Sequence, residues 1–128
     1  MSHYHAIVWI DHVQAHVMHI SPEDVETSVL RPAKSHVHVH SRRGTLGDGR
    51  QPADQDYYHA VAEALKGAKE VLVVGPAQAK LELIKHIHAH DPDMVKCIVG
   101  VETIDHPSDA QLVAYARRYF VAKDRMLS

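Results

Sequence analysis

The stretch EVLVVGPAQAKLELIKHI, from Glu70 to Ile87, joins an apolar run, a Gly-Pro pair and a helical pattern. The continuous β-branched and leucine residues are typical of a strand that is buried on both faces. Proline is favoured at the first position of a helix, so Pro76 is expected to open one. Leu81, Ile84 and His88 continue this helix up to the stop at HDPD. This unit indicates an α/β fold with a parallel crossover.

Similar units lie on both sides of this stretch. The segment DQDYYHAVAEALKG (54–67) predicts a preceding helix, with Asp54 as its cap and Gly67 at its stop. The segment VKCIVGVETI (95–104) predicts a second buried strand. The last segment, SDAQLVAYARRYFVAKD (108–124), predicts a helix with Ser108 and Gln111 in capping-box register.

The first third of the chain predicts strands. YHAIVWID (4–11), QAHVMHIS (14–21) and DVETSVLR (24–31) are rich in strand-forming residues, and short breaks separate them. Three consecutive strands with short connections imply an antiparallel meander. The expected fold class is therefore α/β, in the order βββαβαβα, with a mixed sheet packed by helices in a single domain over residues 1–128.

Composition limits the possible classes of protein. The chain has 128 residues, of which 45% are hydrophobic and 23% charged, which is typical of one globular domain. No apolar run approaches the roughly 18 residues of a membrane helix, so we expect a cytoplasmic protein without a membrane partner. The single cysteine, Cys97, lies in an apolar run and is expected in the core. The sequence indicates no cofactor.

The segment SRRGTLGDGRQPADQ (41–55) interrupts this regular pattern. It is rich in glycine and arginine and contains almost nothing apolar, so we expect a flexible loop between the third strand and the first helix. Residues 31–50 contain five basic residues and one acidic residue, although the whole chain has a net charge of −2. The part of the surface that attracts anions is therefore localised.

The layout resembles the ribonuclease-H-like middle domain of the archaeal and eukaryotic peptide-chain release factors and of Pelota. Among short proteins, it is similar to the bacterial family labelled "translational machinery protein". The glycine and arginine loop occupies the position of the Gly-Gly-Gln loop of release factors, and EVLVVGPAQAKLELIKHI is similar to the family's strand, Gly-Pro turn and helix. The resemblance implies a stand-alone accessory of translation that contacts the ribosome or tRNA.

The resemblance also raises the question of ester hydrolysis. In release factors, the glutamine of the loop helps to place water at the ester of peptidyl-tRNA. The nearest counterpart here is GDGRQ, with Gln51 as the only catalytic candidate. The two glycines are not adjacent, and Arg50 separates Gly49 from Gln51. Whether the chain is an enzyme is left open, with a non-enzymatic role favoured over a peptidyl-tRNA hydrolase.

RNA contact is the favoured role of the loop. Arginine pairs bidentately with phosphate oxygens, glycine lets the loop adapt to the shape of RNA, and a tyrosine offers a base a stacking surface. Since Tyr57 and Tyr58 are adjacent on a helix, we expect that they do not both point into the core. The predicted RNA-binding residues are Arg31, Lys34, Arg42, Arg43, Gly47, Gly49, Arg50 and Tyr57. Arg117 and Arg118 are either a solvated helix face or a second phosphate contact.

Histidines suggest a second class of function. HVHVH puts His36, His38 and His40 on one face of a predicted strand, where they are weak candidates for metal ligands or an edge that pairs in a homodimer. The interpretation we favour is an amphipathic edge strand with a solvated polar face. His86 and His90 lie near a helix C-terminus, where an imidazolium is stabilised by the helix dipole.

Asp11, at the end of the first strand, is where ribonuclease-H-like nucleases hold a metal-binding acid. Asp105, after the last strand, is the one carboxylate expected to approach it. Since two-metal chemistry needs several converging carboxylates, the turn between the first two strands is the favoured role of Asp11.

Overall fold

The computed structural model describes residues 5–32 and 52–127. Its strands are β1 (His5–Ile10), β2 (Ala15–Ile20), β3 (Val25–Leu30), β4 (Glu70–Gly75) and β5 (Ile98–Thr103). Its helices are α1 (Pro52–Leu65), α2 (Ala79–His90), the short α3 (Pro92–Val95) and α4 (Asp109–Leu127). No helix within these ranges is long and apolar enough to cross a lipid bilayer.

The five strands form one mixed sheet in the order β3-β2-β1-β4-β5. β1 pairs antiparallel with β2, and β2 with β3, as the predicted meander requires. β4 pairs parallel with both β1 and β5, as the crossovers require. The predicted ribonuclease-H-like order is thus confirmed, with α3 as an addition that the sequence did not indicate.

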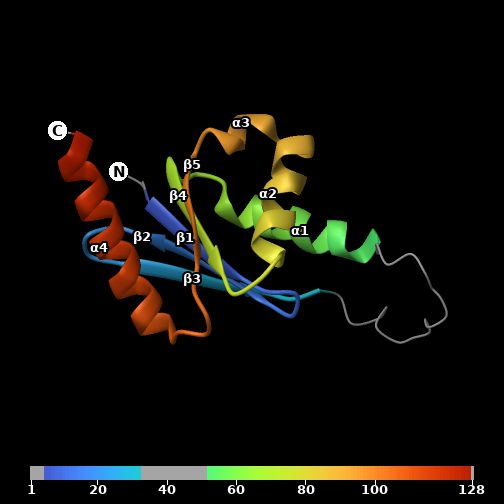
Figure 1. Ribbon diagram of the computed structural model, residues 1–128, viewed down its shortest axis with the longest axis horizontal. Helices are drawn as coiled ribbons and strands as arrows, with labels where there is room; N and C mark the ends of the chain where they lie inside the picture. Colours follow the sequence, from blue (N-terminus) through green and yellow to red (C-terminus); the bar gives the residue numbers. More distant parts are fainter. Residues whose placement is uncertain (1–4, 33–51, 128) are drawn as a thin grey trace.

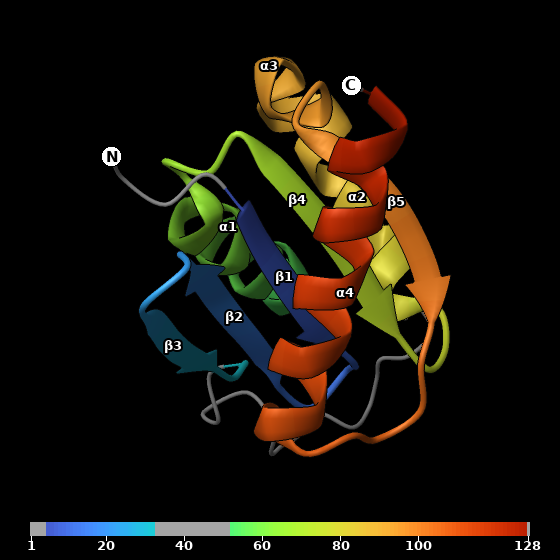
Figure 2. The ribbon, with the colours of Figure 1, turned by 90° about the vertical axis from the view of Figure 1, so that its left-hand side faces the viewer.

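Helices cover both faces of the sheet. α1, α2 and α3 lie on one face and α4 lies on the other (Figure 1, Figure 2). β1 is buried on both faces, because Ala6, Val8 and Ile10 join the core under α1 and α2, whereas Ile7 and Trp9 join the core under α4. This explains why β1 and β4 have continuous apolar runs, whereas the exposed edge strand β3 does not.

Two glycines have structural reasons for being glycine. Gly67 follows α1 with φ of +100°, the left-handed conformation that ends many helices. At Gly75 the backbones of β4 and β1 approach so closely that a Cβ atom would lie 2.2 Å from the carbonyl oxygen of Ile10. The predicted helix stop is confirmed, and the glycine of the Gly-Pro pair is required by close packing.

Several sequence expectations were wrong in detail. Pro76 does not open α2, which begins at Ala79 after three bent residues. α1 begins at Pro52, so Asp54 lies inside the helix and does not precede it as a cap. Among the described strands β5 lies at an edge and is not buried on both sides, because β4 is its one neighbour there and its second half is exposed. Val99 packs against the core under α4, whereas Val101 is exposed.

Candidate nucleic-acid interface

The residues that flank positions 33–51 both adjoin the turn between β1 and β2. On one side, Leu30 of β3 pairs with Ala15, and the exposed Arg31 donates a hydrogen bond of 3.1 Å from its guanidinium to Oε1 of Gln14. On the other side, the first turns of α1 bring the hydroxyl of Tyr57 to 2.8 Å from the carbonyl oxygen of Asp11. One small turn therefore fixes both the start and the end of this connection.

Asp11 shapes this turn. Its Oδ1 accepts hydrogen bonds from the main-chain N–H groups of Val13 at 2.8 Å and Gln14 at 2.9 Å. Such a side-chain bond to the backbone two or three residues on is typical of aspartate in turns. The predicted turn role of Asp11 is confirmed.

Asp105 does approach Asp11, through a shared histidine. Nδ1 of His106 lies 2.8 Å from Oδ1 of Asp105, and its Nε2 lies 3.6 Å from Oδ2 of Asp11. The two carboxylates therefore flank one imidazole. Within residues 5–32 and 52–127, no three His, Cys, Asp or Glu side chains are arranged to hold a metal ion.

Trp9 holds the connection from β5 to α4 beside this cluster. Its indole N–H lies 2.7 Å from the carbonyl oxygen of Asp105 and 3.3 Å from that of Ile104. Its ring lies 5.0 Å from the His106 ring, measured between centroids. The sequence marked Trp9 only as a strand residue, since an indole contact across 96 positions leaves no local pattern.

The two adjacent tyrosines of α1 are both buried, with exposed fractions of 3% for Tyr57 and 1% for Tyr58. The expectation that they do not both point into the core was therefore wrong. α1 packs on the sheet and also against α2, so its buried arc is wide enough for neighbouring positions. Tyr58 donates a hydrogen bond of 2.6 Å to Oε1 of Glu82 on α2. The buried Tyr57 ring has no face for a nucleobase, which removes it from the predicted RNA contacts.

Of the other predicted RNA-binding residues, only Arg31 is described. Its side chain is exposed at the β1–β2 turn, where it offers a positive charge. The remaining candidates, and the predicted catalytic residue Gln51, lie outside the described residues, and so do the histidines of the predicted edge strand. They are Lys34, Arg42, Arg43, Gly47, Gly49, Arg50, His36, His38 and His40.

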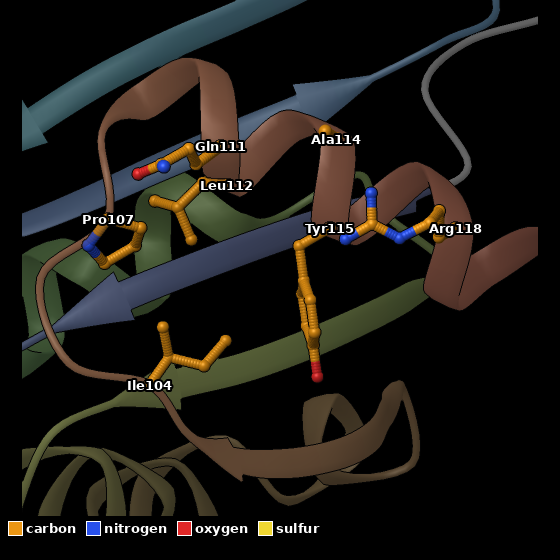
Figure 3. Close-up of a pocket in the computed structure, with 7 residues that line it drawn as sticks. All are labelled: Ile104, Pro107, Gln111, Leu112, Ala114, Tyr115 and Arg118. Carbon is orange, nitrogen blue, oxygen red and sulfur yellow. The ribbon is translucent and has the colours of Figure 1, made fainter.

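The two arginines of α4 have different surroundings. Arg117 is anchored, since its guanidinium donates hydrogen bonds to the carbonyl oxygens of Ser21 at 3.0 Å and Pro22 at 3.5 Å. Arg118 is exposed and borders a shallow hollow of about 350 Å³ between α4 and the end of β5. Figure 3 shows the Tyr115 side chain reaching from α4 across this hollow toward β5. The hydrogen bonds of Arg117 to the carbonyl oxygens of Ser21 and Pro22 thus give this arginine a structural role.

Burial and nearby charges shift the pKa of Tyr115. Partial burial, followed by the nearby Glu102 carboxylate and Tyr119, raises the pKa of the Tyr115 phenol above its ordinary value. The Arg118 guanidinium acts in the opposite direction. The hollow thus joins an apolar wall of Ile104 and Leu112 to the positive charge of Arg118.

A second cavity, of about 220 Å³, lies between α1 and α2. Its wall includes His86. The His86 side chain is buried, so it does not act as a surface residue that caps the helix C-terminus. Burial, reinforced by His90 and His59, lowers the pKa of His86 below its ordinary value, which favours a neutral imidazole. The expected stabilisation of a charged His86 by the helix dipole was therefore wrong.

Comparison with solved structures finds the same fold in translation factors. Archaeoglobus fulgidus Pelota superposes with a TM-score of 0.66 at 18% identity, over 93% of this chain and 32% of that protein. The archaeal translation termination factor aRF1 gives a TM-score of 0.56 at 17% identity, over 95% of this chain and 38% of that one. S. cerevisiae Dom34, a translation termination-like factor, gives 0.52 at 12% identity, over 97% and 39%.

These likenesses confirm the predicted resemblance to the release-factor and Pelota middle domain at the level of fold. The chain spans between about three and four tenths of the length of these proteins. No protein-family model and no curated protein matches the sequence.

Proposed function

We propose that the protein is a translation-associated factor of the cytoplasm that contacts ribosomal RNA or tRNA through the loop at residues 41–55. The observation that carries the proposal is the fold shared with Pelota, aRF1 and Dom34, two of which are described as translation termination or termination-like factors. The loop follows the three-stranded meander in the chain, as the reactive loop does in the release factors that the sequence resembles. The ribosome or tRNA is accordingly the partner we infer.

The anchoring of the loop supports this proposal. Its flanking residues meet at the β1–β2 turn, where Arg31 is held by Gln14 and the start of α1 is fastened through Tyr57 to Asp11. Both flanks of the loop are therefore held at the same turn, which makes this part of the surface the place where we expect RNA to be contacted.

The charges around the turn indicate which residues would bind phosphate. The described surface next to the turn carries the carboxylates of Asp11, Glu82 and Asp105, and Arg31 is the basic residue at this turn among those described. Carboxylates repel phosphate, so affinity for RNA depends on the arginines of the loop. The arginines that we propose as phosphate contacts are Arg42, Arg43 and Arg50.

The test is co-sedimentation of the full chain with ribosomes at low and moderate salt. Each phosphate contact releases counterions, so replacing Arg42, Arg43 and Arg50 together by alanine should lower the slope of log affinity against log salt by about 2 to 3. The matched control replaces Lys69, Lys85 and Lys96 by alanine, which removes the same charge. These lysines are exposed, and two of them, Lys69 and Lys96, precede β4 and β5, at the opposite end of the strands from the β1–β2 turn.

Association of the wild type that the arginine variant loses and the lysine variant keeps would support the proposal. Equal losses of ribosome association in both variants would mean that only the net charge matters, which would contradict contacts by the loop arginines. No association of the wild type at either salt would refute the proposal. Ester hydrolysis at Gln51 stays a prediction, tested by peptide release from peptidyl-tRNA with and without Gln51→Ala.

A further inference from the structure

The cavity between α1 and α2 contains a buried nitrogen that has no hydrogen-bond partner among the described residues. His86 is 7% exposed, and its Nδ1 lies 2.7 Å from Oε1 of Gln55. A carbonyl oxygen only accepts, so Nδ1 carries the proton and Nε2 carries the free lone pair. Nε2 is buried and makes no hydrogen bond with any residue in the ranges 5–32 and 52–127. An unsatisfied buried acceptor costs about 1–3 kcal/mol and calls for a partner that these residues do not supply.

His90 lies one helical turn further along α2, on the same side. Residues four apart on a helix are neighbours on its surface. The centroids of the His86 and His90 rings are 4.4 Å apart, and the ring planes are inclined by 35°. His90 is exposed and forms no hydrogen bond or ion pair with another described residue, so its ring is able to turn toward Nε2 of His86.

The charges of the cavity favour a cation. Glu63 and Asp91 contribute two carboxylates to its wall, against the single ammonium of Lys66. Nζ of Lys66 lies 3.1 Å from Oε2 of Glu63 and 4.0 Å from Oδ2 of Asp91. With neutral imidazoles, the cavity therefore keeps a net negative charge. A lone pair in a negative cavity suits a positive electron-pair acceptor, and it does not suit an anion.

We propose that His86 and His90 chelate one divalent ion of the late first-row transition metals, the class of Cu²⁺ and Zn²⁺, with water completing its coordination. Neutral imidazole suits these metals. The bond from Nδ1–H of His86 to the Gln55 carbonyl is the outer contact that fixes the tautomer of metal-binding histidines. This site goes beyond the proposed contact with RNA and does not depend on it.

Two protein ligands define the kind of site. As the side chains stand, the described residues bring no third His, Cys, Asp or Glu to a common metal position. Structural zinc sites use four protein ligands. A site with two histidines and water is therefore open and exchangeable, and it fastens the last turn of α2 without being needed for folding.

The test is a titration of the full chain, with ¹⁵N-labelled histidine, by Zn²⁺, followed in two-bond ¹H–¹⁵N spectra that report each imidazole nitrogen. The proposal expects that Nε2 of His86 and one ring nitrogen of His90 shift together and saturate at one equivalent. His90→Ala should weaken the binding at least tenfold. His88→Ala is the matched control, because His88 is an exposed histidine of the same helix on another face, and it should leave the binding unchanged.

Two results that involve other histidines would refute the proposed metal site. If the shifts of His86 and His90 disappear when His36, His38 and His40 are replaced together by alanine, the binding belongs to that segment and the proposal is refuted. Equal weakening by His88→Ala and His90→Ala would also refute it, since it would show unspecific binding to surface imidazoles. Because His90 is exposed and His86 is kept, the decisive variant removes no buried side chain from the contact between α1 and α2.

Discussion

The hydroxyl of Tyr57 donates a 2.8 Å hydrogen bond to the main-chain carbonyl of Asp11, which fastens the start of α1 to the β1–β2 turn. This bond joins two segments that are 46 positions apart, and it is part-buried. It also holds α1, the helix that follows positions 33–51, at this turn.

Replacing Tyr57 by phenylalanine removes only this hydroxyl and leaves the ring in the core. The expected cost is about 1 kcal/mol of unfolding free energy, because the carbonyl of Asp11 loses a donor in a partly buried place. Urea denaturation would measure it. Tyr115→Phe is the control, since no described residue accepts a hydrogen bond from that hydroxyl, and its cost should be smaller. Equal costs would contradict a specific role of the Tyr57 bond.

Gly75→Ala is expected to be among the most destabilising single changes in the sheet. The new Cβ would lie 2.2 Å from the carbonyl oxygen of Ile10, so the parallel pairing of β4 with β1 must shift. Overpacking of this kind costs about 1–3 kcal/mol or more. At Gly67 the added Cβ would meet nothing within 4 Å, and the cost there comes only from the positive φ, about 1 kcal/mol. Thermal unfolding of both variants should give the larger loss at Gly75, and the reverse order would refute the close approach.

The start of α4 has a reciprocal capping box. Oγ of Ser108 accepts from the N–H of Gln111 at 3.1 Å, and Oε1 of Gln111 accepts from the N–H of Ser108 at 2.9 Å. We expect Ser108→Ala to cost about 1 kcal/mol. A double-mutant cycle with Gln111→Ala should show that the two costs are not additive, since both bonds stabilise the same turn. Strict additivity would mean that the two bonds act independently.

The raised pKa of Tyr115 predicts that the folded protein loses stability at alkaline pH. Its pKa is raised in the folded protein, mainly by burial, and then by Glu102 and Tyr119. The unfolded chain therefore loses this proton first, and the contribution of the group is fully present below the ordinary pKa of tyrosine and is lost as pH rises through the higher, folded pKa. Glu102→Gln should lower the pKa of Tyr115, and Arg118→Ala should raise it. Titration of ¹³Cζ-labelled tyrosine would follow the group directly, and a shift of opposite sign in either variant would contradict this account.

Periodicity predicted most of the fold because it reports local environment. The doubly buried run Val71–Val74, the meander and the capping box of α4 all appear in the structure where the sequence indicated them. The order of parallel strands followed from the crossovers. The periodicity of a strand does not indicate whether it has a neighbouring strand on both sides. β5 has the composition of a central strand, yet it lies at an edge, because no strand of the part of the chain that the structure describes pairs with its other side.

The site was less predictable, because its contacts join distant residues. Nothing near Trp9 indicates that its indole holds the carbonyl of Asp105, and nothing near Tyr57 and Tyr58 indicates that α2 widens the buried arc of α1. His86 has the spacing of a surface histidine at the end of a helix. Only the packing of α1 against α2 shows that its Nε2 is buried with no hydrogen bond to another described residue.

The parallel pairing of β1 with β4 has a consequence for how the connection 33–51 can change in length. His5 pairs with Glu70, so closing this pair already encloses more than sixty residues. The entropy of closing a loop grows only with the logarithm of its length, and a doubling costs about 0.6 kcal/mol. Because both flanks of the connection meet at the Asp11–Gln14 turn, several residues added or removed there would barely alter folding stability. Insertions and deletions at this one point are therefore thermodynamically inexpensive, and the scaffold can accept loops of very different reach without any change in its core.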